Sequence, residues 1–200
     1  MTNWKRLPDE VYKRLAFHPA RFEVEEHHVA VYAGGDNQTI IRGKRPADLL
    51  RNSIATPSLT AAIMNSKYVN AIPLYRLEQE FSRNDVVLGR QVMANWVIQC
   101  GERYLSLLYD RLHKEIYKSH VLQADETPVC VSKDISGAKA SAIIYSIAET
   151  AKANNLKPYH YFELLLTEIP KHMEDTNLDF LDDLLPWSQK LPVECRKQNQ

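Results

Sequence analysis

The apolar stripe between Arg90 and Lys118 constrains the fold of this chain most strongly. Apolar side chains recur along it at intervals of three and four residues: Val92, Trp96, Val97, Cys100, Tyr104, Leu107, Leu108, Leu112 and Ile116. This spacing places them along one side of a long α-helix. The stripe has to be covered, either by other parts of the chain or by a partner.

Further helices are predicted over residues 59–68, with Ser58 as N-cap, and over residues 74–83, 138–154 and 158–167. A β-hairpin is predicted near the N-terminus. Apolar and polar residues alternate over residues 22–33, a turn follows at Gly34–Asn37, and Ile40–Arg42 would be the returning strand. The fold class is therefore α+β and mostly helical. We expect four regions: a β-containing region 1–57, a helical region 58–118, a strand region 119–134 and a helical region 135–200.

The composition limits the number of domains, the kinds of site and the cellular location that can be expected. The 200 residues allow one or two domains, and 25 Lys and Arg balance 25 Asp and Glu, so any nucleic-acid binding must use a local basic patch. Cys100, Cys130 and Cys195 form no C-x-x-C pair, which disfavours a zinc site and a disulfide framework. Without a signal peptide or a membrane-length apolar run, we expect a cytoplasmic, nucleoid-associated protein.

Residues 74–100 have the spacing of a helix-turn-helix. Leu77, Phe81, Val92 and Trp96 would form the core between the two helices, with a turn at Asn84-Asp85. Arg90, Gln91 and Asn95 would then face outward, where Arg can read guanine and Asn or Gln can read adenine. An ordinary helical hairpin with solvated polar residues fits the same spacing.

A basic cluster precedes these helices. It consists of Arg42, Lys44, Arg45 and Arg51, with Lys67 nearby. These side chains could neutralise DNA phosphates. A solvated surface is the alternative.

An acid follows an apolar strand at residues 120–131. Asp125 could be a metal ligand, but two-metal phosphoryl transfer needs several converging carboxylates, and Glu126 points to the opposite face of a strand. The alternative is a strand-ending acid in a turn, which Thr127-Pro128 favours. On the pattern alone the turn is the better interpretation.

Much of the chain resembles the insertion sequence 66 family of bacterial transposases. The resemblance rests on Asp48–Leu59, Lys67–Glu80, Gly89–Trp96, Val121–Pro128, Gly137–Ser146, Glu149–Asn154 and Leu181–Trp187. It implies a DDE transposase with an RNase H-like catalytic domain and Mg²⁺ dependence. It also implies that Asp125 is the first acid of the catalytic triad and a metal ligand, and that DNA, the element's terminal repeats, is the partner.

The chain also departs from that family. The second catalytic Asp, in a Thr-Asp-Gly-Tyr-like motif, and the motif taken to hold the third acid are missing, and family segments join directly near residues 133–137. The resemblance therefore implies an internally deleted derivative, truncated within the RNase H-like domain, which no longer cuts DNA. Glu149 matches a family position, but no catalytic role is assigned to it.

Three functional hypotheses follow. In the first, the chain keeps DNA binding and has lost strand cleavage. In the second, it is a non-catalytic partner or inhibitor of full-length transposase, or it associates with copies of itself. The partner hypothesis uses the stripes on residues 90–118 and 138–153 as exposed docking surfaces. The third hypothesis is a non-functional gene relic of marginal stability.

Overall fold

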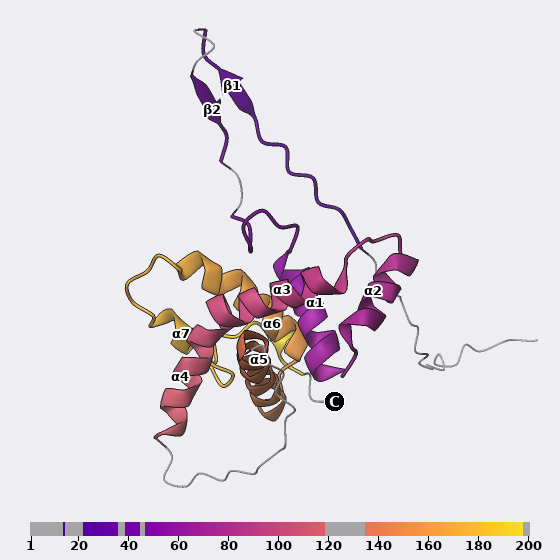
Figure 1. The fold of residues 1–200 in the computed structure, drawn as a ribbon. Coiled ribbons are helices and arrows are strands. Elements are labelled where there is room, and N and C mark those ends of the chain that lie inside the picture. Colours follow the sequence, from indigo (N-terminus) through magenta and orange to yellow (C-terminus); the bar gives the residue numbers. More distant parts are fainter. Residues whose placement is uncertain (1–13, 15–21, 36–38, 45–46, 119–134, 198–200) are drawn as a thin grey trace, which may run out of the picture.

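A computed structural model describes residues 14, 22–35, 39–44, 47–118 and 135–197. The hairpin strands are β1 (Val31–Ala33) and β2 (Ile40–Arg42), and the α-helices are α1 (Pro57–Met64), α2 (Leu74–Arg83), α3 (Arg90–Cys100), α4 (Ser106–Ile116), α5 (Ile135–Ala153), α6 (Pro158–Glu168) and α7 (Phe180–Asp183). The described residues thus form a mostly helical fold with a small antiparallel sheet (Figure 1).

The predicted long helix is confirmed, although it is not uniform. Helices α3 and α4 are joined by the π turn η2 (Gly101–Leu105), so the chain stays helical from Arg90 to Ile116. Gly101 lies where α5 crosses this turn, and a Cβ built there would lie 3.1 Å from the Cβ of Ala140. The missing side chain lets α5 approach η2 closely, which covers the middle of the stripe.

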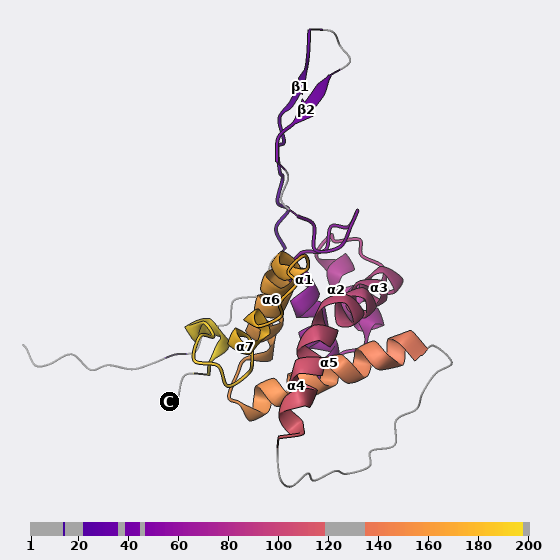
Figure 2. The ribbon, with the colours of Figure 1, turned by 90° about the vertical axis from the view of Figure 1, so that its left-hand side faces the viewer.

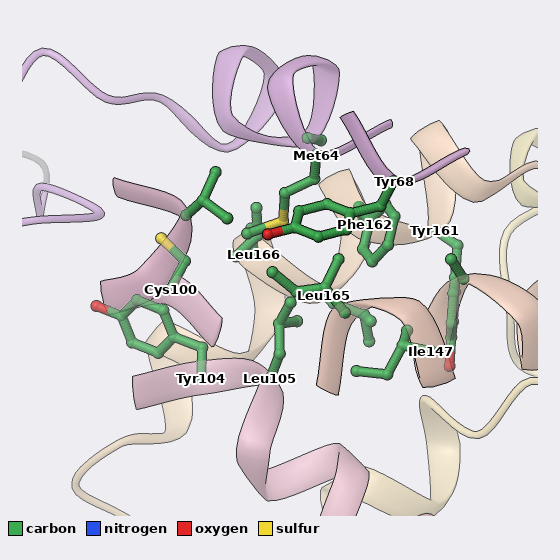
Figure 3. Packing of buried hydrophobic residues seen from close by; sticks show 14 of the residues in the cluster. Met64, Tyr68, Cys100, Tyr104, Leu105, Ile147, Tyr161, Phe162, Leu165 and Leu166 are labelled. Atoms are coloured by element: carbon green, nitrogen blue, oxygen red, sulfur yellow. The ribbon is translucent and has the colours of Figure 1, made fainter. Parts of the chain in front are cut away.

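Side chains from helices α1, α5 and α6 and from the π turn η2 meet in the core. Met64 of α1, Leu105 of η2, and Leu165 and Leu166 of α6 lie together in Figure 3, with Ile147 of α5 nearby, and all of them are buried. The stripes of residues 90–118 and 138–153 therefore mostly pack inside the chain. Treating them as exposed docking surfaces was wrong, because α5 covers η2 and the flanking helices.

The N-terminal hairpin stands away from this helical body in two perpendicular views (Figures 1 and 2). Tyr32 pairs with Ile41 in an antiparallel register, and Val31 pairs with Arg42. All six strand residues are exposed, including Val31, Tyr32, Ile40 and Ile41. A two-stranded hairpin whose side chains do not pack against the rest of the described chain is only marginally stable in water.

Three details differ from the sequence-based expectations. Residues 22–30 do not form a strand, and only Val31–Ala33 pairs. The N-cap of α1 is Thr56 and not Ser58, since the Thr56 hydroxyl accepts the Leu59 N–H at 3.2 Å and Pro57 occupies the first helical position. The expected strand at residues 120–131, and with it the RNase H-like remnant, lies outside the described residues.

None of the helices among the described residues is long and apolar enough to cross a membrane.

Candidate nucleic-acid interface

The turn between α2 and α3 is defined by one left-handed residue and by hydrogen bonds of the backbone. Asp85 adopts a left-handed conformation with φ of 61°, and the Val86 N–H donates to the Phe81 carbonyl at 2.9 Å. This pattern closes the C-terminus of α2. Across the turn, the Glu78 carboxylate accepts the Arg90 N–H at 3.1 Å and so caps the first turn of α3 from α2.

The contact between α2 and α3 is apolar. Leu77, Phe81 and Trp96 are buried, as predicted. Val92 was also assigned to this core, but its side chain is 42% exposed, and Met93 is buried instead. The buried positions of α3 are Met93, Trp96, Val97 and Cys100, and Val92 lies one position outside that face.

The solvent face of α3 carries the three predicted side chains. Arg90, Gln91 and Asn95 are all exposed, and within the described part of the chain none of their side chains has a hydrogen bond or ion pair. Gln99 follows Asn95 by one helical turn, so Gln91, Asn95 and Gln99 form a row of amides. Gln99 was not predicted, although its i+4 spacing from Asn95 was the available signal.

A hollow of about 390 Å³ flanks this row. Its polar lining consists of Arg51, Asn52, Ser53, Asn95 and Gln99. Its apolar lining consists of Leu50, Ile54, Leu88, Val92 and Trp96. The structure therefore brings together Arg51 and Asn95, which the sequence assigned to two separate motifs, and the hollow contains no carboxylate.

The loop that carries Arg51 is held in place by buried side chains and by a hydrogen bond from η2. Leu49, Leu50 and Ala55 are buried, and the Tyr104 hydroxyl of η2 donates to the Leu49 carbonyl at 2.6 Å. Burial raises the pKa of the Tyr104 phenol, so the hydroxyl stays protonated as a donor. Asn52 has φ of 56°, and the Ser53 N–H donates to the Leu50 carbonyl at 3.2 Å. The result is a tight turn that projects Arg51 toward α3.

The predicted basic cluster is divided. Arg42 ends β2 and Lys44 follows it, so both are exposed at the base of the arm, whereas Arg51 lines the hollow. Lys67 lies over the Tyr68 ring, with its Nζ 5.1 Å from the ring centroid. Arg45 lies outside the described residues. Among the described cations Arg42, Lys44, Arg51 and Lys67, Arg51 lines the hollow and the other three do not.

The described residues do not fit a magnesium site. They contain no group of three or more His, Cys, Asp and Glu side chains that could hold a metal ion. Asp125, the predicted catalytic residue and metal ligand, lies outside the described residues. Glu149 is exposed on α5, and its carboxylate accepts a hydrogen bond from the Lys152 ammonium at 2.7 Å. No catalytic step can be derived from these side chains.

A family model described as Transposase IS66 family matches residues 52–176. The chain belongs to the IS66 transposase family. The matched range includes the hollow from Asn52 onward and all of α1 to α6, whereas the hairpin and Arg51 precede it.

One relative is an uncharacterized protein, y4qI, of Sinorhizobium fredii. It is 29% identical over 136 residues, which cover 68% of this chain and 25% of that protein. The chain thus aligns with only a quarter of the relative's length. No solved structure matches this member of the IS66 family.

Proposed function

We propose that this IS66 family chain binds the terminal DNA of a mobile element through α3 and does not cut it. The observation that carries the proposal is the row of amides on α3, with Arg90 at its start. These side chains are exposed and make no hydrogen bond or ion pair within the described residues. Polar groups held on a rigid helix without internal partners are available to a ligand.

The chemistry of this face suits the edges of base pairs. Asn and Gln amides pair with the N6 and N7 atoms of adenine, and Arg pairs with guanine. Residues 90–101 contain no Asp or Glu, so no carboxylate of this segment repels phosphate. The hydrogen bond between Glu78 and the Arg90 N–H supports the proposed helix-turn-helix, because it fixes α3 relative to α2.

Phosphate contacts would come from the flanks. Arg51 lies beside α3, while Arg42 and Lys44 extend from the base of the arm. Contacts of this kind position a protein on DNA and make its affinity fall with added salt. Such binding would place the protein on the nucleoid.

We propose further that strand cleavage is lost. Resemblance to the DDE transposases assigns Asp125 as the first acid, and the motifs for the other two acids are missing from the sequence. A Mg²⁺ pair needs several carboxylates to share it, and Asp125 alone would not hold two ions in a reactive arrangement. An internal deletion within the RNase H-like domain accounts for this pattern.

The test is binding of the purified chain to two duplexes, measured by fluorescence anisotropy at low and moderate salt. One duplex carries the element's terminal repeat, and the other carries the same bases in scrambled order. We expect a preference for the terminal repeat and no Mg²⁺-dependent nicking of either duplex. Equal, salt-sensitive affinities would contradict base readout by α3, and nicking that is abolished in Asp125→Asn would contradict the loss of cleavage.

A second candidate is a non-catalytic partner of full-length transposase, or self-association. The exposed Val31, Tyr32, Ile40 and Ile41 of the arm favour it, since a paired apolar ribbon with open edges invites another chain. Tagged chain should then copurify with intact transposase, and Tyr32→Ser/Ile41→Ser should abolish this. A monomer that ignores the intact enzyme would exclude this candidate.

A further inference from the structure

We propose that the hollow beside α3 takes an adenine displaced from the double helix. This inference rests on the proposed DNA binding and deepens it: Asn95 and Gln99 contact the displaced adenine, while Arg90 and Gln91 contact bases within the duplex. A volume of about 390 Å³ lies at the lower end of the range of small-molecule sites, which run from about 300 to 1,000 Å³. A single nucleotide is a ligand of that size class.

The polar groups match an adenine edge. Asn95 and Gln99 come from successive turns of α3, and both amides line the hollow without a partner in the described residues. A side-chain amide offers one acceptor and two donors, which complements the N6 amino group and the neighbouring ring nitrogen of adenine. The absence of a carboxylate among the lining residues disfavours an amine or a metal ion.

The apolar groups match the faces of a base. Val92 is 42% exposed, and Ile54, on the opposite loop, is 76% exposed. Both side chains line the hollow, and packing within the chain does not bury either of them. Enzymes that extrude a base hold it between apolar side chains and read its pairing edge by hydrogen bonds. Val92 and Ile54 supply that apolar surface here.

Arg51 supplies the phosphate contact. It follows the buried Leu49 and Leu50 and precedes the left-handed Asn52, so the backbone that carries it is fixed. Its guanidinium is exposed at the rim of the hollow and forms no ion pair within the described residues. An extruded nucleotide brings its phosphate with it, and Arg pairs with phosphate through two parallel hydrogen bonds.

The test places 2-aminopurine next to each adenine of the terminal repeat in turn, so that the adenine keeps its N6 amino group. The fluorescence of 2-aminopurine rises when the neighbouring adenine leaves the stack. Saturating protein should raise the fluorescence several-fold at one position. At protein concentrations that saturate the duplex for each variant, Gln99→Ala and Ile54→Ala should remove the rise. Gln99 and Ile54 are both exposed, and the Gln99 amide forms no hydrogen bond within the described residues, so both variants should fold.

Gln91→Ala is the matched control, since Gln91 lies on α3 but does not line the hollow. It should weaken binding and keep the rise at saturation. A second measurement uses an abasic site opposite the responding adenine, which should tighten binding of the unaltered chain several-fold but not of Gln99→Ala. Binding without a rise at any adenine would overturn this inference alone. Failure to bind any duplex would overturn the proposed function and this inference together.

Discussion

The Glu78 carboxylate accepts the Arg90 backbone N–H at 3.1 Å and thereby links the two helices of the proposed DNA-binding unit. Helix N-termini leave N–H groups without partners, and an acceptor there typically contributes about 1 kcal/mol. No side chain from the turn itself caps α3, because Gly89 occupies the capping position. The orientation of the polar face therefore depends on a residue of the preceding helix.

Replacing Glu78 by Ala should lower the free energy of unfolding by about 1 kcal/mol, because α3 loses its acceptor. Glu78→Gln should lose much less, since the amide oxygen can still accept. Urea denaturation measures both. Glu80→Ala is the matched control, as Glu80 is exposed on the same helix. Equal losses at positions 78 and 80 would show that the cap contributes nothing.

Tyr104→Phe should destabilise the chain by about 1–3 kcal/mol, because the buried Leu49 carbonyl loses its donor. It should also loosen the loop that presents Arg51. Chemical denaturation gives the first effect, and hydrogen exchange of the Ser53 amide gives the second. Tyr117→Phe, at an exposed tyrosine, should change neither. Unchanged stability of Tyr104→Phe would mean that water replaces the hydroxyl without cost.

Ala71→Gly should stabilise the chain. Ala71 adopts φ of 56° just after the helical turn that ends at Val69, and this region costs a residue with a Cβ about 1–2 kcal/mol. The greater freedom of glycine in the unfolded chain offsets part of the gain, so we expect a net increase of about 0.5–1 kcal/mol. Ala62→Gly inside α1 should instead lose about 1 kcal/mol. A lower melting temperature for Ala71→Gly would contradict this account.

Stability should fall at alkaline pH. Burial raises the pKa of the Cys100 thiol to about 12 from a usual value of 9.0. The unfolded chain therefore loses this proton first, and each pH unit above the unfolded pKa favours unfolding by up to about 1.4 kcal/mol. The contribution is complete below the unfolded pKa and disappears as pH rises toward the folded value. Burial also raises the pKa of Tyr68 and Tyr161, which extends the loss above about pH 10.

Denaturation midpoints recorded from neutral pH to about pH 11 test this directly. Cys100→Ala should flatten the first part of the decline, where the tyrosines are still protonated in both states. An identical decline in the variant would show that Cys100 does not contribute.

The helices were predictable because their apolar residues follow a period of 3.6, which a single sequence displays. The exact ends of the helices and the residues on their buried faces were harder to predict. Thr56 caps α1 because Pro57 fixes the first turn, and the pattern alone favoured Ser58. Val92 is exposed because the buried face of α3 is formed by Met93, Trp96, Val97 and Cys100, and Val92 lies one position outside that face.

The exposed face of α3 was also predictable, since Arg90, Gln91 and Asn95 precede or interrupt an apolar stripe. The hollow was not. Arg51 and Asn95 are far apart in sequence. They line one hollow in a structure where the hydrogen bond from Tyr104 to Leu49 and the burial of Leu50 fix the loop that carries Arg51. No local periodicity reports a contact of that kind. Asp125 stays a prediction, as its segment lies outside the described residues.

The most direct test of the account compares the unaltered chain with Gln91→Ala/Asn95→Ala on the terminal-repeat and scrambled duplexes. Each lost bidentate base contact should cost about 1–3 kcal/mol on the terminal repeat and little on the scrambled duplex, so the ratio of the two affinities should fall at least tenfold. Gln189→Ala, at an exposed amide remote in sequence from α3, should leave the ratio unchanged. An unaltered ratio in the double variant would show that α3 does not read the DNA.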